Sequence, residues 1–88
     1  MKKISYFNNK NMIHDRLRHY RKERKLSQEQ VGARLQTMNV NIDQQALSRI
    51  ENNSRIVTDY ELACLCKVLG VTEREMLADF YEKLPEQD

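Results

Sequence analysis

Three patterns of one kind, each a start signal for an α-helix, divide this chain. In a capping box, a Ser or Thr side chain accepts a hydrogen bond from the backbone amide three residues later, and a Glu or Gln at that later position bonds back. The three pairs are Ser27 with Gln30, Thr58 with Glu61, and Thr72 with Glu75. Asp43 is a further residue of the type that caps helix N-termini. These positions predict four helices.

Apolar residues follow each start signal at helical spacing. A fifth helix is expected before the first capping box, from residue 11 to about residue 24, because Ile13, Leu17 and Tyr20 share one side of it. The expected inward residues of the other four are Val31, Leu35 and Met38; Ala46, Leu47 and Ile50; Leu62, Leu65, Cys66 and Leu69; and Met76, Leu77 and Phe80. The polar stretch 39–41 separates the second helix from the third. The sequence therefore predicts five helices.

A chain of 88 residues sets a limit of one domain with a modest core. Gly (2) and Pro (1) are too scarce for a strand-rich fold or a flexible linker. We expect a flexible basic N-terminal arm over 1–10, a compact all-α domain over 11–84 and a tail over 85–88. No apolar run approaches the roughly 20 residues that span a bilayer, and no apolar leader is present, so the expected location is cytoplasmic.

The charge is distributed unevenly along the chain. Residues 1–25 hold nine basic and two acidic side chains, a net charge of +7, whereas residues 58–88 hold three basic and eight acidic ones, a net charge of −5. The residues between them balance at zero, so the whole chain is only +2. One end is expected to attract polyanions and the other to repel them.

The segment 27–51 consists of two helical patterns joined by a polar turn. The second pattern opens with Gln44 and Gln45, which face outward together with Ser48 and Arg49 when the apolar residues face inward. Gln can bond adenine through N6 and N7 in the major groove, and Arg can bond guanine through O6 and N7. This arrangement is typical of a helix-turn-helix that contacts double-stranded DNA.

Residues 13–77 resemble the Cro/lambda-repressor, or Xre, type of helix-turn-helix DNA-binding domain. The motifs that carry the resemblance are Arg21-Lys22-Glu23-Arg24-Lys25-Leu26-Ser27-Gln28, Leu47-Ser48-Arg49-Ile50-Glu51-Asn52, and Thr58-Asp59-Tyr60-Glu61-Leu62 leading to Val68-Leu69-Gly70-Val71. The resemblance implies a compact five-helix lambda-repressor-like fold, in which the second and third helices form the helix-turn-helix.

The resemblance also implies roles for particular residues. Base contacts would come from Gln44, Gln45, Ser48 and Arg49, and backbone contacts from Ser27, Gln28, Asn52 and Arg55. Independently of the resemblance, a helix N-terminus presents free amides and partial positive charge, which suits a phosphate. Arg21 and Glu51 would form a partly buried ion pair that sets the angle between helices.

The chain departs from the family pattern in two places. Between Leu35 and Asp43 it has seven residues, a longer stretch than the usual turn of three or four. The extra length, within 36–42, would either extend the second helix by a turn or form an ordered loop near the DNA backbone. Asn53 stands where Gly is common, and Asn tolerates a left-handed conformation better than most residues.

Catalytic and metal sites are not indicated. Cys64 and Cys66 are two residues apart and do not share a helical face, so we interpret them as packing residues. His14 and His19 lack companions at ligand spacing. The sequence also lacks a phosphate-cradling glycine loop and a nucleophile motif. We expect no enzyme activity, no cofactor and no metal.

The function expected from these patterns is that of a transcriptional regulator, a repressor that binds an inverted repeat as a homodimer. Two copies are expected because one short helix contacts few base pairs. The contact would come from Leu77, Phe80, Tyr81 and Leu84, which exceed what so short a helix needs inside. The alternative is an antitoxin or interaction module whose acidic end holds a partner protein while the helix-turn-helix binds its own operator.

Overall fold

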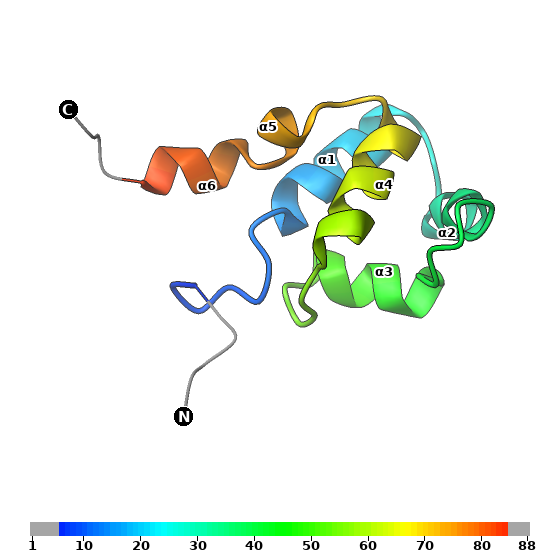
Figure 1. Cartoon of the computed structure of the whole chain (residues 1–88), viewed down its shortest axis with the longest axis horizontal. Coiled ribbons are helices and arrows are strands. Elements are labelled where there is room, and N and C mark those ends of the chain that lie inside the picture. The colour runs from blue at the N-terminus through cyan, green and yellow to red at the C-terminus, as the bar shows by residue number, and fades with distance from the viewer. Residues whose placement is uncertain (1–5, 85–88) are drawn as a thin grey trace.

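The computed structural model describes residues 6–84, which form six α-helices and no β-strand. The helices are α1 (His14–Glu23), α2 (Gln28–Gln36), α3 (Gln44–Glu51), α4 (Asp59–Leu69), α5 (Glu73–Met76) and α6 (Ala78–Lys83). Helix α3 packs on α1 and α2, and α4 packs on α2 and α5. In the view of Figure 1, α3 forms the lower edge and α6 lies at the opposite end from α2. The all-α prediction is confirmed.

All four predicted helix starts are confirmed, with the predicted cap at each one. The hydroxyl groups of Ser27, Thr58 and Thr72 accept hydrogen bonds from the amides three residues on, and the Gln or Glu at each of those positions bonds back. The carboxylate of Asp43 accepts from the amide of Ala46 at 2.9 Å. Each cap satisfies amides that would otherwise lack partners in the first turn.

Four helices end in the same way, with a residue in the left-handed region. These residues are Lys25, Asn39, Asn53 and Gly70, with φ angles of 58°, 63°, 61° and 69°. In each case the amides of this residue and of the next one bond back to carbonyl groups in the last turn of the helix. Asn and Gly adopt this conformation readily, whereas Lys adopts it at a cost.

The core lies between α1, α2, α3 and α4. Its fully buried side chains are Leu17, Val31, Leu35, Ile42, Leu47, Ile50, Leu65, Cys66, Leu69 and Met76. Most of them were expected to face inward from their spacing. Ile42, and Val40 at 3% exposure, were not expected in the core, because they belong to the stretch between helices rather than to a helical pattern.

The extended stretch between α2 and α3 is an ordered loop, and α2 is not lengthened. Helix α2 ends at Gln36, and the backbone turns away after it because Asn39 adopts a left-handed conformation. The amide of Val40 then donates to the carbonyl of Leu35 and closes the turn. The backbone of Ile42 then passes close to Gly32, where the Cβ atom of any other residue would lie 3.2 Å from the Ile42 carbonyl oxygen. A side chain at position 32 would require this backbone to shift by a few tenths of an ångström, so Gly32 suits the close approach.

The last predicted helix, from Thr72 through Phe80, is divided at Leu77. In a straight helix Met76 and Phe80 would point the same way, because they are four residues apart. In the structure Met76 is fully buried, whereas Phe80 is half-buried and its ring lies 5.4 Å from that of Tyr6. The break between α5 and α6 therefore lets these two side chains contact different parts of the molecule.

The start of the chain also differs from expectation. Helix α1 begins at His14 rather than Asn11, because the Asn11 side chain accepts from the amide of Ile13 and turns the backbone before the helix. Residues 6–10 fall within the predicted flexible arm, yet Tyr6 and Asn9 exchange two backbone hydrogen bonds of 2.8 Å. The rest of the arm, 1–5, and the tail, 85–88, lie outside the described residues.

In the described part of the chain, the helices are too short and too polar to cross a bilayer.

Candidate nucleic-acid interface

The outward face of α3 carries the side chains that were expected to contact bases. Gln44, Gln45 and Arg49 are exposed and Ser48 is half-buried, while Leu47 and Ile50 hold the opposite face in the core. Within residues 6–84, the Gln44, Gln45 and Arg49 side chains make no hydrogen bond to another residue. These amide and guanidinium groups are thus free to bond an external partner.

Glu51, the last residue of α3, is the centre of a buried polar cluster. Its carboxylate receives hydrogen bonds from Arg21 Nε at 2.6 Å and Nη2 at 3.0 Å, and from Gln28 Nε2 at 3.2 Å. Arg21 also donates to the carbonyl of Leu26 at 2.9 Å. The side chain of Glu51 is 1% exposed and that of Arg21 is 12% exposed. This cluster connects α1, the start of α2 and the end of α3.

Burial alone would raise the pKa of Glu51, because it disfavours the charged carboxylate. Hydrogen bonds from Arg21 and Gln28, and the positive charge of Arg21, outweigh burial, so the pKa of Glu51 lies below its ordinary value. The same hydrogen bond raises the pKa of Arg21. Both groups are therefore charged at neutral pH.

Of the two backbone candidates at the start of α2, Gln28 contacts this cluster and Ser27 caps the helix. Ser27 caps the helix by accepting from the amide of Gln30 at 3.0 Å. The Gln28 side chain is half-buried and donates to Glu51, so its amide group is oriented by the end of α3. The first turn of α2 and the last turn of α3 are consequently held together by a direct side-chain contact.

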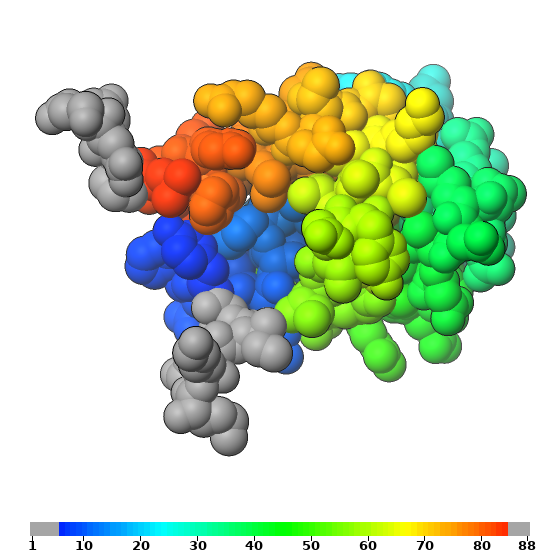
Figure 2. Space-filling view, viewed as in Figure 1, coloured from blue at the N-terminus to red at the C-terminus, as the bar shows by residue number. Residues whose placement is uncertain are grey.

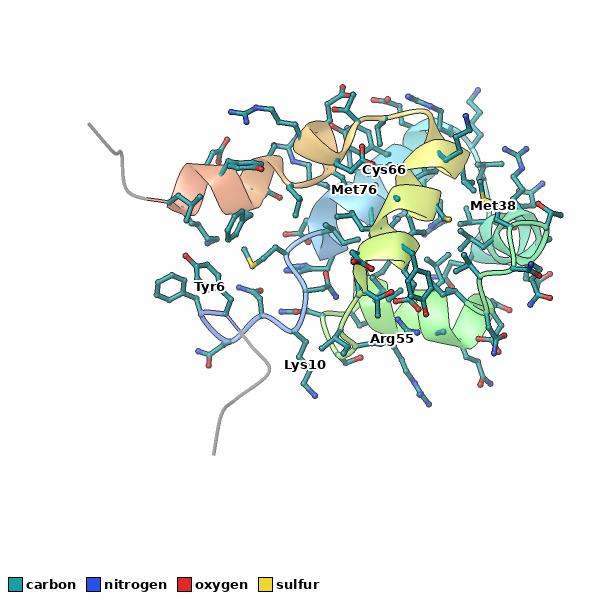
Figure 3. All side chains as sticks on the ribbon, in the orientation of Figure 1. Tyr6, Lys10, Met38, Arg55, Cys66 and Met76 are labelled. Atoms are coloured by element: carbon teal, nitrogen blue, oxygen red, sulfur yellow. The ribbon has the colours of Figure 1, made fainter. Side chains whose placement is uncertain are left out.

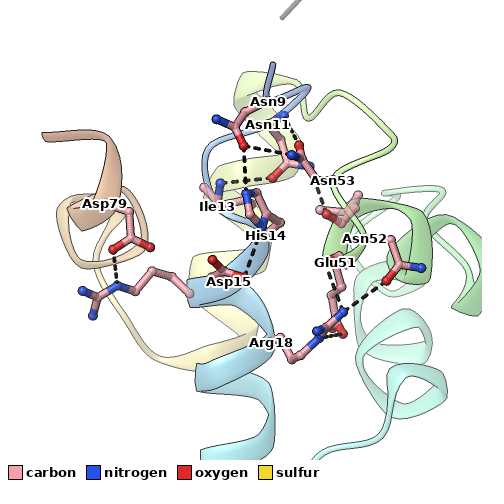
Figure 4. Close-up of polar contacts among 12 residues, drawn as sticks. Asn9, Asn11, Ile13, His14, Asp15, Arg18, Glu51, Asn52, Asn53 and Asp79 are labelled. Atoms are coloured by element: carbon pink, nitrogen blue, oxygen red, sulfur yellow. Dashed lines mark hydrogen bonds and ion pairs between the residues drawn. The ribbon is translucent and has the colours of Figure 1, made fainter. Parts of the chain in front are cut away.

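Arg18 is a site residue that the sequence analysis missed. Its Nη2 donates to the side-chain oxygen of Asn52 at 3.1 Å and to the carbonyl of Glu51 at 3.2 Å (Figure 4). Because Arg18 takes the amide oxygen of Asn52, the Nδ2 group is the part of that side chain left to donate outward. The available signal was spacing, since Arg18 precedes Arg21 by three residues and shares its helix face.

Arg55 is engaged in an ion pair that was not expected. Its Nη1 and Nη2 lie 3.1 and 2.9 Å from the two carboxylate oxygens of Glu61, which also accepts from the amide of Thr58 at 2.9 Å. The bond from Arg55 lowers the pKa of Glu61 against the opposing effect of burial. The predicted phosphate contact of Arg55 would have to share or break this pair.

A group of asparagines joins the start of the chain to the end of α3 (Figure 4). The side-chain oxygen of Asn53 accepts from the amides of Lys10 at 2.9 Å and Asn11 at 3.4 Å, and its Nδ2 donates to Asn9 at 2.8 Å. Asn11 donates to the carbonyls of Ile50 at 3.0 Å and Arg55 at 2.9 Å. Segment 9–11 is thereby attached to the turn after α3.

The residues weighed for metal or redox chemistry are separated. No group of three or more His, Cys, Asp or Glu side chains within 6–84 is placed to hold a metal ion. Cys66 is buried, and burial together with the charges of Glu73 and Glu75 raises the pKa of its thiol to about 11. Such a thiol is unreactive at neutral pH. Cys64 is half-buried and free.

Apolar side chains are exposed at the far end of the molecule from α2. Tyr81 and Leu84 are 42% and 40% exposed, and Leu77 and Phe80 line a hollow of about 370 Å³ together with Met12. Figure 2 shows this hollow between the N-terminal segment, α4 and α6. Of the four residues expected to form a dimer contact, Leu77 and Phe80 thus line this hollow, whereas Tyr81 lines a separate one with Thr72 and Arg74.

Comparison with known proteins gave one match. A family model described as helix-turn-helix matches residues 17–76, which include the Glu51 cluster and the exposed face of α3. No curated protein and no solved structure matches the chain.

Proposed function

The chain belongs to the Cro/C1, or Xre, type family of helix-turn-helix domains, a family of DNA-binding transcription regulators, and on this premise we propose that it is a repressor that binds an inverted repeat as a homodimer. The observation that carries the proposal is the free outward face of α3. Two adjacent amide side chains stand there on a helix whose end is held by a buried ion pair.

In the proposed complex, α3 lies in the major groove and contacts bases through its first two turns. Gln44 and Gln45 bond adenines, since each can donate to N7 and accept from the N6 amino group. Arg49 bonds a guanine or a phosphate, and Ser48 contacts the adjacent base edge. Base contacts of this kind provide the sequence preference of the complex.

Contacts to the phosphate backbone fix the register of α3 without selecting a sequence. The proposed contacts are the amides near Ser27 and Gln28 at the start of α2 and the side chain of Asn52 after α3. Gln28 and Asn52 are both oriented by hydrogen bonds within the Glu51 cluster. The arrangement supports two backbone contacts near the C-terminal end of α3, one from the start of α2 and one from Asn52.

A homodimer would place two copies of α3 in successive major grooves, about 34 Å apart on one face of the duplex. The proposed contact is the apolar surface formed by the exposed Tyr81 and Leu84 and the half-buried Leu77 and Phe80. It lies at the end of the molecule away from α2, so it leaves α2 and α3 accessible (Figure 1). Exposed aromatic side chains of this kind are frequent in protein interfaces.

Selection of bound duplexes from a random pool tests DNA binding, palindromy and half-site spacing together. We expect enrichment of an inverted repeat with A·T pairs at the positions nearest Gln44 and Gln45. Enrichment of a single half-site would overturn the homodimer, and absence of any enrichment would overturn sequence-specific binding.

The same apolar surface is compatible with the second proposal, a partner protein bound at the acidic end while α3 binds an operator. The two proposals differ in the size of the complex on DNA. A homodimer places two chains on each duplex without another protein, and light scattering of the purified chain with the selected duplex measures this directly.

A further inference from the structure

Lys10 is held next to the end of α3, although the two are far apart in sequence. Its backbone amide donates to the side-chain oxygen of Asn53 at 2.9 Å, and Asn53 belongs to the turn that follows α3. The amide of Asn11 approaches the same oxygen at 3.4 Å. The left-handed conformation of Asn53 closes the turn, so the backbone of Lys10 has a defined place beside it.

The side chain of Lys10 extends away from the molecule on the side where α3 lies. In Figure 3 the side chain points downward, away from the body of the molecule. Helix α3 forms the lower edge in the same view, and α1 and α4 lie above that edge. Lys10 is exposed, and no acidic side chain of residues 6–84 lies within ion-pair distance of it. Its ammonium group is therefore available to an external anion.

Two of the other cations near this end of α3, Arg55 and Arg18, are engaged, whereas Arg49 lies free on the face expected to contact bases. Arg55 is bound by both carboxylate oxygens of Glu61, and Arg18 is bound to Glu51 and Asn52. Both make contacts within the domain, whereas the Lys10 ammonium does not. Beside the free Arg49 on α3 itself, the free positive charge at this position thus comes from Lys10, before α1, rather than from Arg55 in the turn after α3.

We propose that Lys10 donates to a phosphate of the DNA backbone beside the C-terminal end of α3, at a position set by Asn53. This inference rests on the proposed function, since it requires α3 to face the major groove. Lys acts as a point charge toward phosphate and does not select bases. The expected contribution is therefore equal on the operator and on unrelated duplexes.

The test measures the binding constant of the full chain for the selected duplex and for a random duplex over a series of salt concentrations. Lys10→Gln should make the negative slope of log Kobs against log salt shallower by about 0.9, the value for one lost phosphate contact. Affinity should fall by the same factor on both duplexes. The melting temperature should not change, because the ammonium group has no partner in the domain.

Lys67→Gln is the matched control. It removes the same charge from an exposed Lys in the last turn of α4, at the end of that helix away from α3. We expect its slope to equal that of the wild type. Equal slopes for Lys10→Gln and the wild type would overturn the proposal, and so would equal losses in the two variants, since net charge would then explain the effect.

A second variant tests the anchoring by Asn53. Asn53→Gly keeps the left-handed turn and removes the side chain that bonds Lys10. We expect it to weaken binding, and we expect Lys10→Gln to cost less in its background than in the wild type. Additive losses would overturn the anchoring. If the wild type itself binds no duplex, the proposed function fails; if it binds and only the Lys10 variant has no effect, this inference alone fails.

Discussion

The guanidinium of Arg21 donates two hydrogen bonds to the carboxylate of Glu51, at 2.6 and 3.0 Å, and so connects the last turn of α1 to the last residue of α3. Both side chains are largely removed from water. A buried charge that loses its partner is costly, so this contact constrains the angle of α3 strongly. Any change at either residue is expected to affect folding before it affects a DNA contact.

Glu51→Gln should lower the free energy of unfolding by about 3 kcal/mol, because it leaves the Arg21 charge without a buried counter-charge. Urea denaturation at neutral pH measures the difference. Glu23→Gln is the control, since the Glu23 side chain is 51% exposed and its contacts are at the surface. A Glu51 variant as stable as the control would show that the pair contributes nothing to the fold.

Acid should destabilise the domain through the same groups. The pKa values of Glu51 and Glu61 are lowered in the folded state, so their contribution to stability is complete above the unfolded pKa of about 4.3 and is lost as the pH falls through the folded values. We expect the free energy of unfolding to be nearly constant from pH 7 to about pH 5 and to fall below about pH 4. In the double variant Glu51→Gln, Glu61→Gln the free energy of unfolding should fall less steeply with decreasing pH than in the wild type. An equally steep fall would show that other groups cause the acid destabilisation.

Replacing both Gln44 and Gln45 with Ala should remove the preference for the selected operator. The ratio of operator to random-duplex affinity should fall by about tenfold or more, since each bidentate pair contributes about 1–3 kcal/mol of discrimination. Binding to the random duplex should remain, because backbone contacts are intact. Competition binding measures the ratio; equal losses on both duplexes would contradict the base-contact role.

Arg55→Ala should lower the free energy of unfolding by about 2 kcal/mol, because Glu61 is 7% exposed and would lose its bidentate partner. Arg34→Ala, an exposed position on α2, serves as the control. The salt dependence of DNA binding in the Arg55 variant tests the second role predicted for this residue. A salt-dependence slope that is shallower by about one would mean that Arg55 also contacts a phosphate.

Lys25→Gly should stabilise the domain by about 1 kcal/mol, because Lys25 has a φ of 58° and only Gly adopts that conformation without a steric cost. Lys22→Gly is the matched control and should have the opposite sign, since Lys22 lies within α1 and Gly weakens a helix by about 1 kcal/mol. Thermal unfolding of both variants measures the difference. A destabilised Lys25 variant would show that its side chain packs in a way that outweighs the backbone strain.

Helix starts were predictable because they depend on residues three positions apart. A Thr or Ser and the Glu or Gln that completes the box interact within a single turn, so the sequence contains the whole interaction. The apolar faces of α2, α3 and α4 followed for the same reason, since helical spacing is a local property. The left-handed conformation of Asn53 was also predictable, because it depends on the conformational range of Asn itself and on the helix that precedes it.

The paths between helices were not predictable in this way. The sequence left open whether 36–42 lengthened α2 or formed a loop. The loop places Ile42 in the core and its backbone close to Gly32, and both contacts require the assembled domain. The pairing of Arg55 with Glu61 and the place of Lys10 beside Asn53 likewise require the assembled domain.

Local chemistry along the chain thus specified which segments are helical and which residues face outward on α3, because those properties arise within a turn or two. Which cations remain free beside α3 depends on contacts that form only in the folded domain. A charge selects its partner by distance in space and not by distance along the chain, so Arg55 pairs with Glu61 while the Lys10 ammonium stays unpaired among the described residues.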